Sequence, residues 1–286
     1  MSEQPRKIDL PWKKSGPDEV ATNFAIGSLR ESLLQWLKDG RGVHAETLMV
    51  VIGTLAGFAA QSAAWARIRK RDVPSVPGTE AASIVDNSEG SVADFGEYLR
   101  RSGLFLQSVS KSGERFYWGD LINGYLVPQP TSPYSLWGFV AAAALEAGVP
   151  KSELPDYREM FRYVAGTVGR PEFGMPRSPV NHRPALLPRK ALEIFWPRAR
   201  YIFDRTDGPG PAKGHSVAPE YWPIAIALVA QQFVRFSKET LDPRLAVSLV
   251  MESAIAMSKV DPNKVPQKLP NQSQTEHLDT TSRPVP

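Results

Sequence analysis

Residues 47–66 form an unbroken run of twenty residues without a formal charge, and this run constrains the fold most strongly. A helix of that length can cross a lipid bilayer. Gly53 and Gly57 supply the small-residue spacing with which membrane helices pack closely. The basic cluster at 67–71 would then lie on the cytoplasmic side. The run therefore allows two interpretations, a single membrane span and a helix at the centre of a protein core.

The composition of the run favours the core. Alanine and glycine supply much of it and contribute little to membrane insertion, and Gln61 is costly in hydrocarbon unless it finds a partner. Residues 221–236 are equally apolar but contain two glutamines, and residues 134–147 are too few to span a bilayer. Three apolar helices that are each poor membrane spans suit one another as core neighbours. We therefore expect residues 47–66 to lie inside a helical core, which makes a membrane partner the less favoured interpretation.

The chain contains no cysteine, which excludes disulfide bonds, thiol nucleophiles and cysteine-ligated metal centres. The first residues carry mixed charge and an early proline but no apolar segment, so we do not expect a secretory signal. Hydrophobic residues make up 42% and charged residues 22% of the sequence, as in ordinary soluble domains. These features predict a soluble cytoplasmic protein. The formal net charge of +4 keeps nucleic acid among the possible partners without arguing for it.

Apolar residues recur at helical spacing along most of the chain, and glycines and prolines mark the ends of the helices. Asp18 is the expected cap of the first helix, which Gly40 and Gly42 should close, and Ser132 with Pro133 should open the helix at 134–147. Pro197 should kink or split another helix. Beyond the first helix, we expect helices at 44–69, 91–101, 134–147, 152–168, 189–203, 221–238 and 243–259, with a helical turn at 121–126.

The clearest strand signal lies between residues 104 and 118. Apolar and polar residues alternate from Leu104 to Ser110, a Lys-Ser-Gly-Glu turn follows, and Arg115 to Trp118 returns as a second strand. A short strand at 83–86 is also possible. The predicted fold is therefore mainly α, a multi-helix globular bundle with one small β-hairpin or sheet.

The predicted organisation is a single folded unit with loose ends. Residues 1–17 should form a flexible arm and residues 18–258 one helical domain, with a possible β-containing insertion at 72–130. Residues 259–286 are polar and rich in proline, with little to bury, so we expect a disordered C-terminal tail.

The sequence lacks the common signatures of cofactor and metal sites, so we expect neither. Its four histidines do not have zinc-binding spacing, and His44 with Glu46 is typical of a first helical turn. The glycine-rich segment at 207–214 contains two prolines, which remove backbone donors that a phosphate loop needs. The chain also has no Gly-x-Ser-x-Gly nucleophile motif.

One alternative is an enzyme with a pocket between the hairpin and the loop at 204–216. Asp120 follows the aromatic run Phe116–Trp118, and aromatic walls can raise the pKa of a carboxyl group. His215 and Tyr221 are the other candidate catalytic residues. The competing interpretation of Asp120 is a helix cap for the turn at 121.

A second alternative is a nucleic-acid or polyanion binder that uses residues 170–205. This region is rich in arginine and contains Trp196 and Tyr201, and nucleic-acid sites combine basic faces with aromatic platforms. Such arginines also commonly pair with acids of their own chain. The candidate binding residues are Arg177, Arg183, Arg189, Arg198 and Arg200.

The leading functional prediction is a protein-binding or self-associating helical module, so the expected partner is another protein or a second copy of the chain. Its support is the lack of the usual enzymatic signatures, together with long proline-rich loops between helices. The two alternatives above and a single-span membrane protein remain open.

Overall fold

The computed structural model describes residues 10–12, 16–70, 106–110, 113–130 and 134–269. Within these residues the protein is mainly α, as predicted, with two small antiparallel β-ladders. The predicted strand at 83–86, the predicted helix at 91–101 and most of the proposed insertion lie outside the described residues. So do most of the N-terminal arm and the last part of the tail.

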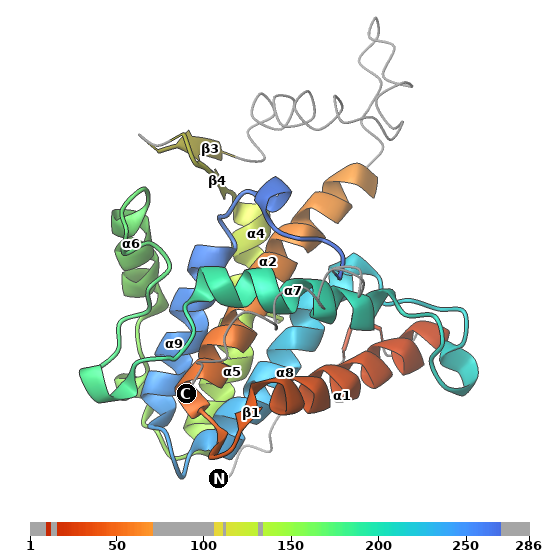
Figure 1. The fold of residues 1–286 in the computed structure, drawn as a ribbon, viewed down its shortest axis with the longest axis horizontal. Helices are drawn as coiled ribbons and strands as arrows, with labels where there is room; N and C mark the ends of the chain where they lie inside the picture. Colours follow the sequence, from red (N-terminus) through yellow and green to blue (C-terminus); the bar gives the residue numbers. More distant parts are fainter. Residues whose placement is uncertain (1–9, 13–15, 71–105, 111–112, 131–133, 270–286) are drawn as a thin grey trace, which may run out of the picture.

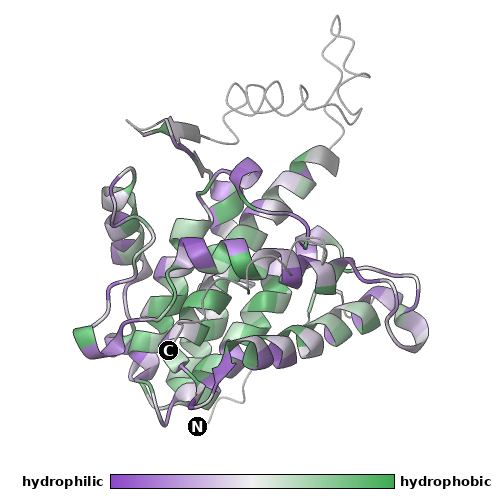
Figure 2. Cartoon of the chain, viewed as in Figure 1, coloured by the Kyte–Doolittle hydropathy of each residue, from purple (hydrophilic) through white to green (hydrophobic). Residues whose placement is uncertain are grey.

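The helices form a bundle, and α7 crosses the front of this bundle in the view of Figure 1. Their bounds are α1 (Pro17–Leu37), α2 (Ala45–Lys70), α4 (Asp120–Leu126), α5 (Leu136–Glu146), α6 (Tyr157–Thr167), α7 (Pro188–Asp204), α8 (Trp222–Ser237) and α9 (Pro243–Met257). Apolar residues gather on the central helices and polar residues on the outer connections (Figure 2).

Helix α2 forms the centre of the core, and this confirms the predicted interior position of the uncharged run. Residues 46–61 are all buried, and α2 packs against α7, α8 and α9. By length and composition α2 could cross a membrane, yet nearly all of its apolar window is covered by the rest of the chain. Gln61 finds a partner inside the core, because its side-chain amide donates to the Val260 carbonyl at 2.9 Å. The helix is apolar on all sides because neighbouring helices surround it.

The predicted hairpin is present. Strands β3 (Leu106–Val109) and β4 (Arg115–Trp118) are antiparallel, and their register pairs Leu106 with Trp118 and Val109 with Arg115. The hairpin is tied to the end of α9, since the Tyr117 amide donates to the Lys259 carbonyl at 2.8 Å. Residues far apart in the sequence therefore share one edge of the bundle.

Two predicted helix caps are wrong. α1 begins at Pro17, directly after Gly16, whose φ of 60° is not helical. Asp18 therefore lies inside the first turn and is not the cap residue. α5 begins at Leu136, because the Ser135 hydroxyl accepts from the Gly138 amide at 3.1 Å and satisfies a free donor of the first turn. Ser132, the predicted cap, lies outside the described residues.

Two further expectations need correction. After α1 the chain forms a second small ladder, β1 (Lys38–Asp39) with β2 (Gly42–Val43), and does not simply stop at the glycines. Gly42 has a φ of 113°, a conformation that favours glycine in this tight turn. α7 runs continuously through the buried Pro197, so this proline does not split the helix.

The folded part extends beyond the predicted boundary at 258. Lys259, Val260 and Asp261 are buried after α9, and Val265 packs on the core. The Gln267 side chain then accepts hydrogen bonds from Trp196 and Arg200 of α7. The polar composition of residues 259–269 predicts disorder, but a few long-range contacts hold these residues in place.

Candidate anion-binding groove

The structure does not bring the three predicted catalytic residues together. Asp120 is exposed at the first position of α4, beside the hairpin. The exposed His215 lies 4.0 Å from Asp18 of α1, and the Tyr221 ring packs against Trp12 with centroids 5.6 Å apart. The hairpin and the loop at 204–216 lie at opposite sides of the molecule (Figure 1).

Four of the five predicted polyanion-binding arginines have partners within the chain. Arg177 binds the buried Glu252 of α9, and Arg189 pairs with Glu114 of the hairpin turn. Arg198 lies over the Trp36 ring at 5.4 Å, and Arg200 pairs with Asp204. Arg183 is exposed. Each of these four arginines contacts a different residue of the chain. This arrangement does not favour one continuous basic face.

The Arg177–Glu252 pair anchors the loop after α6 to the core. Glu252 is 2% exposed, and Arg177 reaches it through its backbone amide and its Nε, each at 2.6 Å. The Arg177 guanidinium also lies 4.6 Å from the Tyr163 ring centroid. Burial raises the pKa of the Glu252 carboxyl, and the bonds from Arg177 oppose that rise. This arginine is therefore a structural anchor.

A second anchor joins the same loop to the start of α2. His182 Nδ1 lies 2.7 Å from Glu46 Oε1, and His44 Nε2 lies 3.4 Å from Glu46 Oε2. The Ala185 amide donates to the Thr47 hydroxyl at 2.9 Å. Among the described residues, no group of three acids or histidines has an arrangement that could hold a metal ion. Glu46, His44 and His182 therefore form a polar cluster, here called the Glu46 clasp, that joins the loop after α6 to the start of α2.

Lys259 is the most perturbed cation in the described part of the chain. It is fully buried, its Nζ donates to Asn123 Oδ1 at 2.7 Å, and the Trp118 and Phe161 ring centroids lie 5.3 and 5.7 Å away. Burial lowers its pKa to about 7, while the negative charge of Asp120 opposes the change. Lys259 does not line the groove described next.

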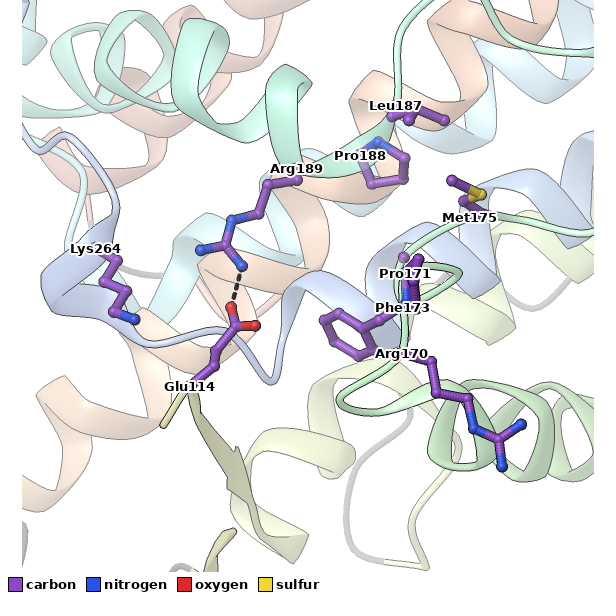
Figure 3. Close-up of a pocket in the computed structure, with 10 residues that line it drawn as sticks. Glu114, Arg170, Pro171, Phe173, Met175, Leu187, Pro188, Arg189 and Lys264 are labelled. Carbon is purple, nitrogen blue, oxygen red and sulfur yellow. Dashed lines mark hydrogen bonds and ion pairs between the residues drawn. The ribbon is translucent and has the colours of Figure 1, made fainter. Parts of the chain in front are cut away.

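An open groove of about 480 Å³ lies where the hairpin turn, the loop after α6 and the start of α7 meet (Figure 3). Its apolar wall includes a phenylalanine, a methionine, a leucine and two prolines, and its charged residues are three cations and one acid. The lining residues are Glu114, Arg170, Pro171, Phe173, Gly174, Met175, Leu187, Pro188, Arg189 and Lys264. A volume of this size accommodates small organic ligands.

The Glu114–Arg189 ion pair lies at the centre of the groove (Figure 3). Lys264 and Phe173 lie on opposite sides of this pair in the view, and the Arg170 guanidinium points away from it. Phe173 is held in place edge-on against Phe116, with ring centroids 4.8 Å apart. The pair therefore has a further cation on one side and an aromatic ring on the other.

The start of α7 adds positive potential to the groove. α7 is seventeen residues long, its cap residue Leu187 makes no side-chain capping bond, and Pro188 and Arg189 form its first turn. The amino end of a helix carries a partial positive charge. With Arg189 and Lys264 this helix end favours an anion, and Glu114 balances only part of that charge.

Only Arg189 of this groove was among the predicted binding residues. Arg170 belongs to the predicted arginine-rich region but is not one of the five candidate arginines, and Lys264 lies in the segment for which the sequence predicts a disordered tail. The sequence carries no local signal for this groove, because Glu114 and Arg189 are 75 residues apart and no short spacing links them.

Comparison of the chain with protein-family models, curated protein sequences and solved structures finds no match.

Proposed function

We propose that the protein binds a small organic anion with an apolar part in this groove. The observation that carries the proposal is that Arg189 and Lys264, with one acid, lie beside an apolar wall at the start of α7. An arginine guanidinium can bind a carboxylate or phosphate through two parallel bonds. The apolar wall would cover a ring or an alkyl group, so the groove favours an amphiphilic ligand over a bare ion.

Calorimetric titration with phenyl phosphate, which joins a dianion to an aromatic ring, tests this proposal. Arg189→Met and Lys264→Met should each weaken binding about tenfold, a loss of about 1.4 kcal/mol. Lys190→Met is the matched control, since Lys190 is the next residue of α7 and pairs with Glu193 outside the groove lining. It should bind as the wild type does.

The salt dependence and a second ligand complete the test. Phenyl phosphate binding should weaken as the salt concentration rises, because exposed charges are screened. Inorganic phosphate should bind more weakly than phenyl phosphate if the apolar wall contributes. The proposal fails if the wild type does not bind millimolar phenyl phosphate, or if Arg189→Met and Lys264→Met bind it unchanged.

A second candidate function is self-association through the end of α8. Phe236 is 68% exposed and Leu145 is 43% exposed, and the ion pair between Arg235 and Glu146 joins their two helices. Exposed apolar side chains next to one cation and one anion can pair with the same residues of a second copy across a twofold axis. Sedimentation should detect a dimer that Phe236→Asp dissociates, and a monomeric wild type at about 100 µM would exclude this candidate.

We also propose that the protein is water-soluble, as the sequence led us to expect. The support is that α2, the one described helix with the length and composition of a membrane span, is covered by its own chain. Fractionation of untagged protein expressed without detergent tests this. Recovery in the soluble fraction is the expected result, and a pellet that resists carbonate extraction would contradict it.

A further inference from the structure

The apolar wall of the groove contains two kinds of apolar group. Leu187 and Pro188, at the start of α7, supply aliphatic carbon. Phe173 and Met175, in the loop after α6, supply an aromatic ring and a thioether (Figure 3). Aliphatic groups attract any apolar surface roughly in proportion to its area. An aromatic ring and a thioether also form favourable contacts that are specific to a second aromatic ring. The loop side of the wall can therefore distinguish an aromatic ligand from an aliphatic one.

Phe173 is held with part of its ring at the groove. The side chain is partly buried, and its ring packs edge-on against Phe116 of β4, with centroids 4.8 Å apart and an angle of 76° between the ring planes. Phe116 itself is fully buried. The Phe173 amide donates to the Arg170 carbonyl at 3.1 Å, which restrains the backbone of the same turn. The contact with Phe116 therefore fixes the ring that a ligand would meet.

Met175 combines a restrained backbone with an accessible side chain. The Tyr163 hydroxyl donates to the Met175 carbonyl at 2.9 Å. The preceding residue, Gly174, has a φ of 85°, and a Cβ at this position would lie 3.1 Å from Met257 Cε of α9. Met175 is 40% exposed, so a ligand in the groove can reach its thioether. Phe173 and Met175 therefore lie two residues apart in a loop segment that is packed against the core.

We infer that Phe173 and Met175 make the groove selective for aromatic anions over alkyl anions of the same charge and carbon number. This inference rests on the proposed function of the groove. It assigns the apolar part of the ligand to an aromatic ring, which contacts the loop side of the wall. Phe173 is the main determinant, because its ring provides the larger contact surface.

Paired calorimetric titrations with phenyl phosphate and cyclohexyl phosphate test the inference. At pH 8, well above a second phosphate pKa of about 6, both ligands are dianions on a six-carbon ring. Glu114 therefore opposes the binding of both ligands alike, and the comparison isolates the ring. The cyclohexyl group has more apolar surface, so burial alone would favour cyclohexyl phosphate. The wild type should instead bind phenyl phosphate about fivefold more tightly.

Two variants test the residues. Phe173→Leu keeps an apolar side chain against Phe116 but removes the ring, and the preference for phenyl phosphate should fall to about twofold or less. Met175→Leu removes the sulfur at similar volume and should lower the preference in the same direction by a smaller factor. Leu187→Ala is the matched control on the aliphatic side of the wall. It should weaken the binding of both ligands and leave the ratio of their affinities unchanged.

Equal affinities of the wild type for the two ligands overturn the inference, as does a preference that persists unchanged in Phe173→Leu. If urea unfolding shows that Phe173→Leu is not cooperatively folded, the ratio in Met175→Leu decides in its place. In these cases, phenyl phosphate binding that Arg189→Met still weakens leaves the proposed function standing. Failure of the wild type to bind either ligand overturns the proposed function, and the inference with it.

Discussion

Gly57 of α2 lies so close to Ala254 of α9 that a Cβ at position 57 would be 2.0 Å from the Ala254 carbonyl oxygen. One turn earlier, a Cβ at Gly53 would be 2.2 Å from the Val250 carbonyl oxygen. Both obstacles are backbone atoms of α9, so no side-chain rotation can make room. The two glycines let the two helix backbones touch, and this contact sets the spacing at the centre of the core.

Gly57→Ala should therefore destabilise the protein by about 3 kcal/mol or more, at the upper end of the usual cost of overpacking. The measurement is the free energy of unfolding from urea titration. Gly27→Ala is the matched control, because Gly27 lies inside α1 with no atom within 4 Å of an added Cβ. That change should be neutral or stabilise by up to about 1 kcal/mol. Equal stability of Gly57→Ala and wild type would contradict the close helix contact.

The depressed pKa of Lys259 predicts a stability that rises with pH. Below pH 7 the lysine is charged in both the folded and the unfolded chain, so the full cost of burying the charge is present. Between the folded pKa of about 7 and the ordinary lysine pKa of 10.5, the folded state is neutral while the unfolded state stays protonated. The unfolded state then binds more protons, so stability increases as the pH rises through this window.

Lys259→Met should remove this dependence and stabilise the protein near pH 6.5 by roughly 5 kcal/mol at most, from the pKa difference. Urea unfolding at pH 6.5, 8 and 9.5 would measure it. The wild-type curve should rise across the series, and the variant should be flat over the same range. A variant that is less stable than the wild type at pH 6.5 would show that the contacts with Asn123, Trp118 and Phe161 outweigh the cost of burial.

The Arg177–Glu252 pair should contribute to stability through the buried carboxylate. Arg177→Ala leaves Glu252 with only the backbone amide at residue 177, and should cost roughly 2–4 kcal/mol, since the arginine is half exposed and solvent can partly replace it. Arg183→Ala, at an exposed arginine in the same loop, should change stability by less than about 0.5 kcal/mol. Thermal unfolding of the two variants side by side checks this, and equal melting temperatures would contradict the anchor.

The Glu46 clasp predicts an acid-sensitive contribution to stability. Burial raises the pKa of the Glu46 carboxyl, but the hydrogen bond with His182 and the charges of His44 and His182 bring that pKa below its ordinary value of 4.5. A lowered folded pKa gives stability that is present above pH 4.5 and is lost as the pH falls through the folded pKa. Glu46→Gln should therefore be less stable than the wild type at pH 6, and the difference should shrink toward pH 3. A constant difference over this range, measured by urea unfolding, would contradict the prediction.

Local patterns were sufficient for the helical fold. The alternation from Leu104 to Ser110 with a glycine turn predicted the hairpin. The helix expected at 243–259 begins at Pro243 as α9, where the Asp242 carboxylate accepts from the Arg244 amide at 2.8 Å. The misplaced cap at Ser132 arose because Ser135, three residues later, could cap the helix as well, whereas α1 begins before Asp18, after a glycine that has no side chain to cap it. Short-range propensity ranks such choices poorly when the next turn offers an equal partner.

Local sequence patterns do not predict the candidate groove. Lys264 comes after α9, Arg189 begins α7 and Glu114 sits in the hairpin turn, so their meeting depends on how the helices cross. The predicted set of Asp120, His215 and Tyr221 assumed that the hairpin and the loop at 204–216 are neighbours. The bundle separates these two segments, and the positions of residues far apart in sequence follow from helix packing rather than from local spacing.

The amino-acid sequence by itself determined that this chain forms apolar helices around an uncharged central run and that Gly53 and Gly57 permit close packing there. Those features depend on the size, charge and hydropathy of residues within a few helical turns. Only the tertiary structure decided which charges meet, that Lys259 is buried with a pKa of about 7, and that Glu114 shares a groove with Arg189. Electrostatic energies depend on distance and burial, and for residues 75 or more positions apart the folded topology sets both.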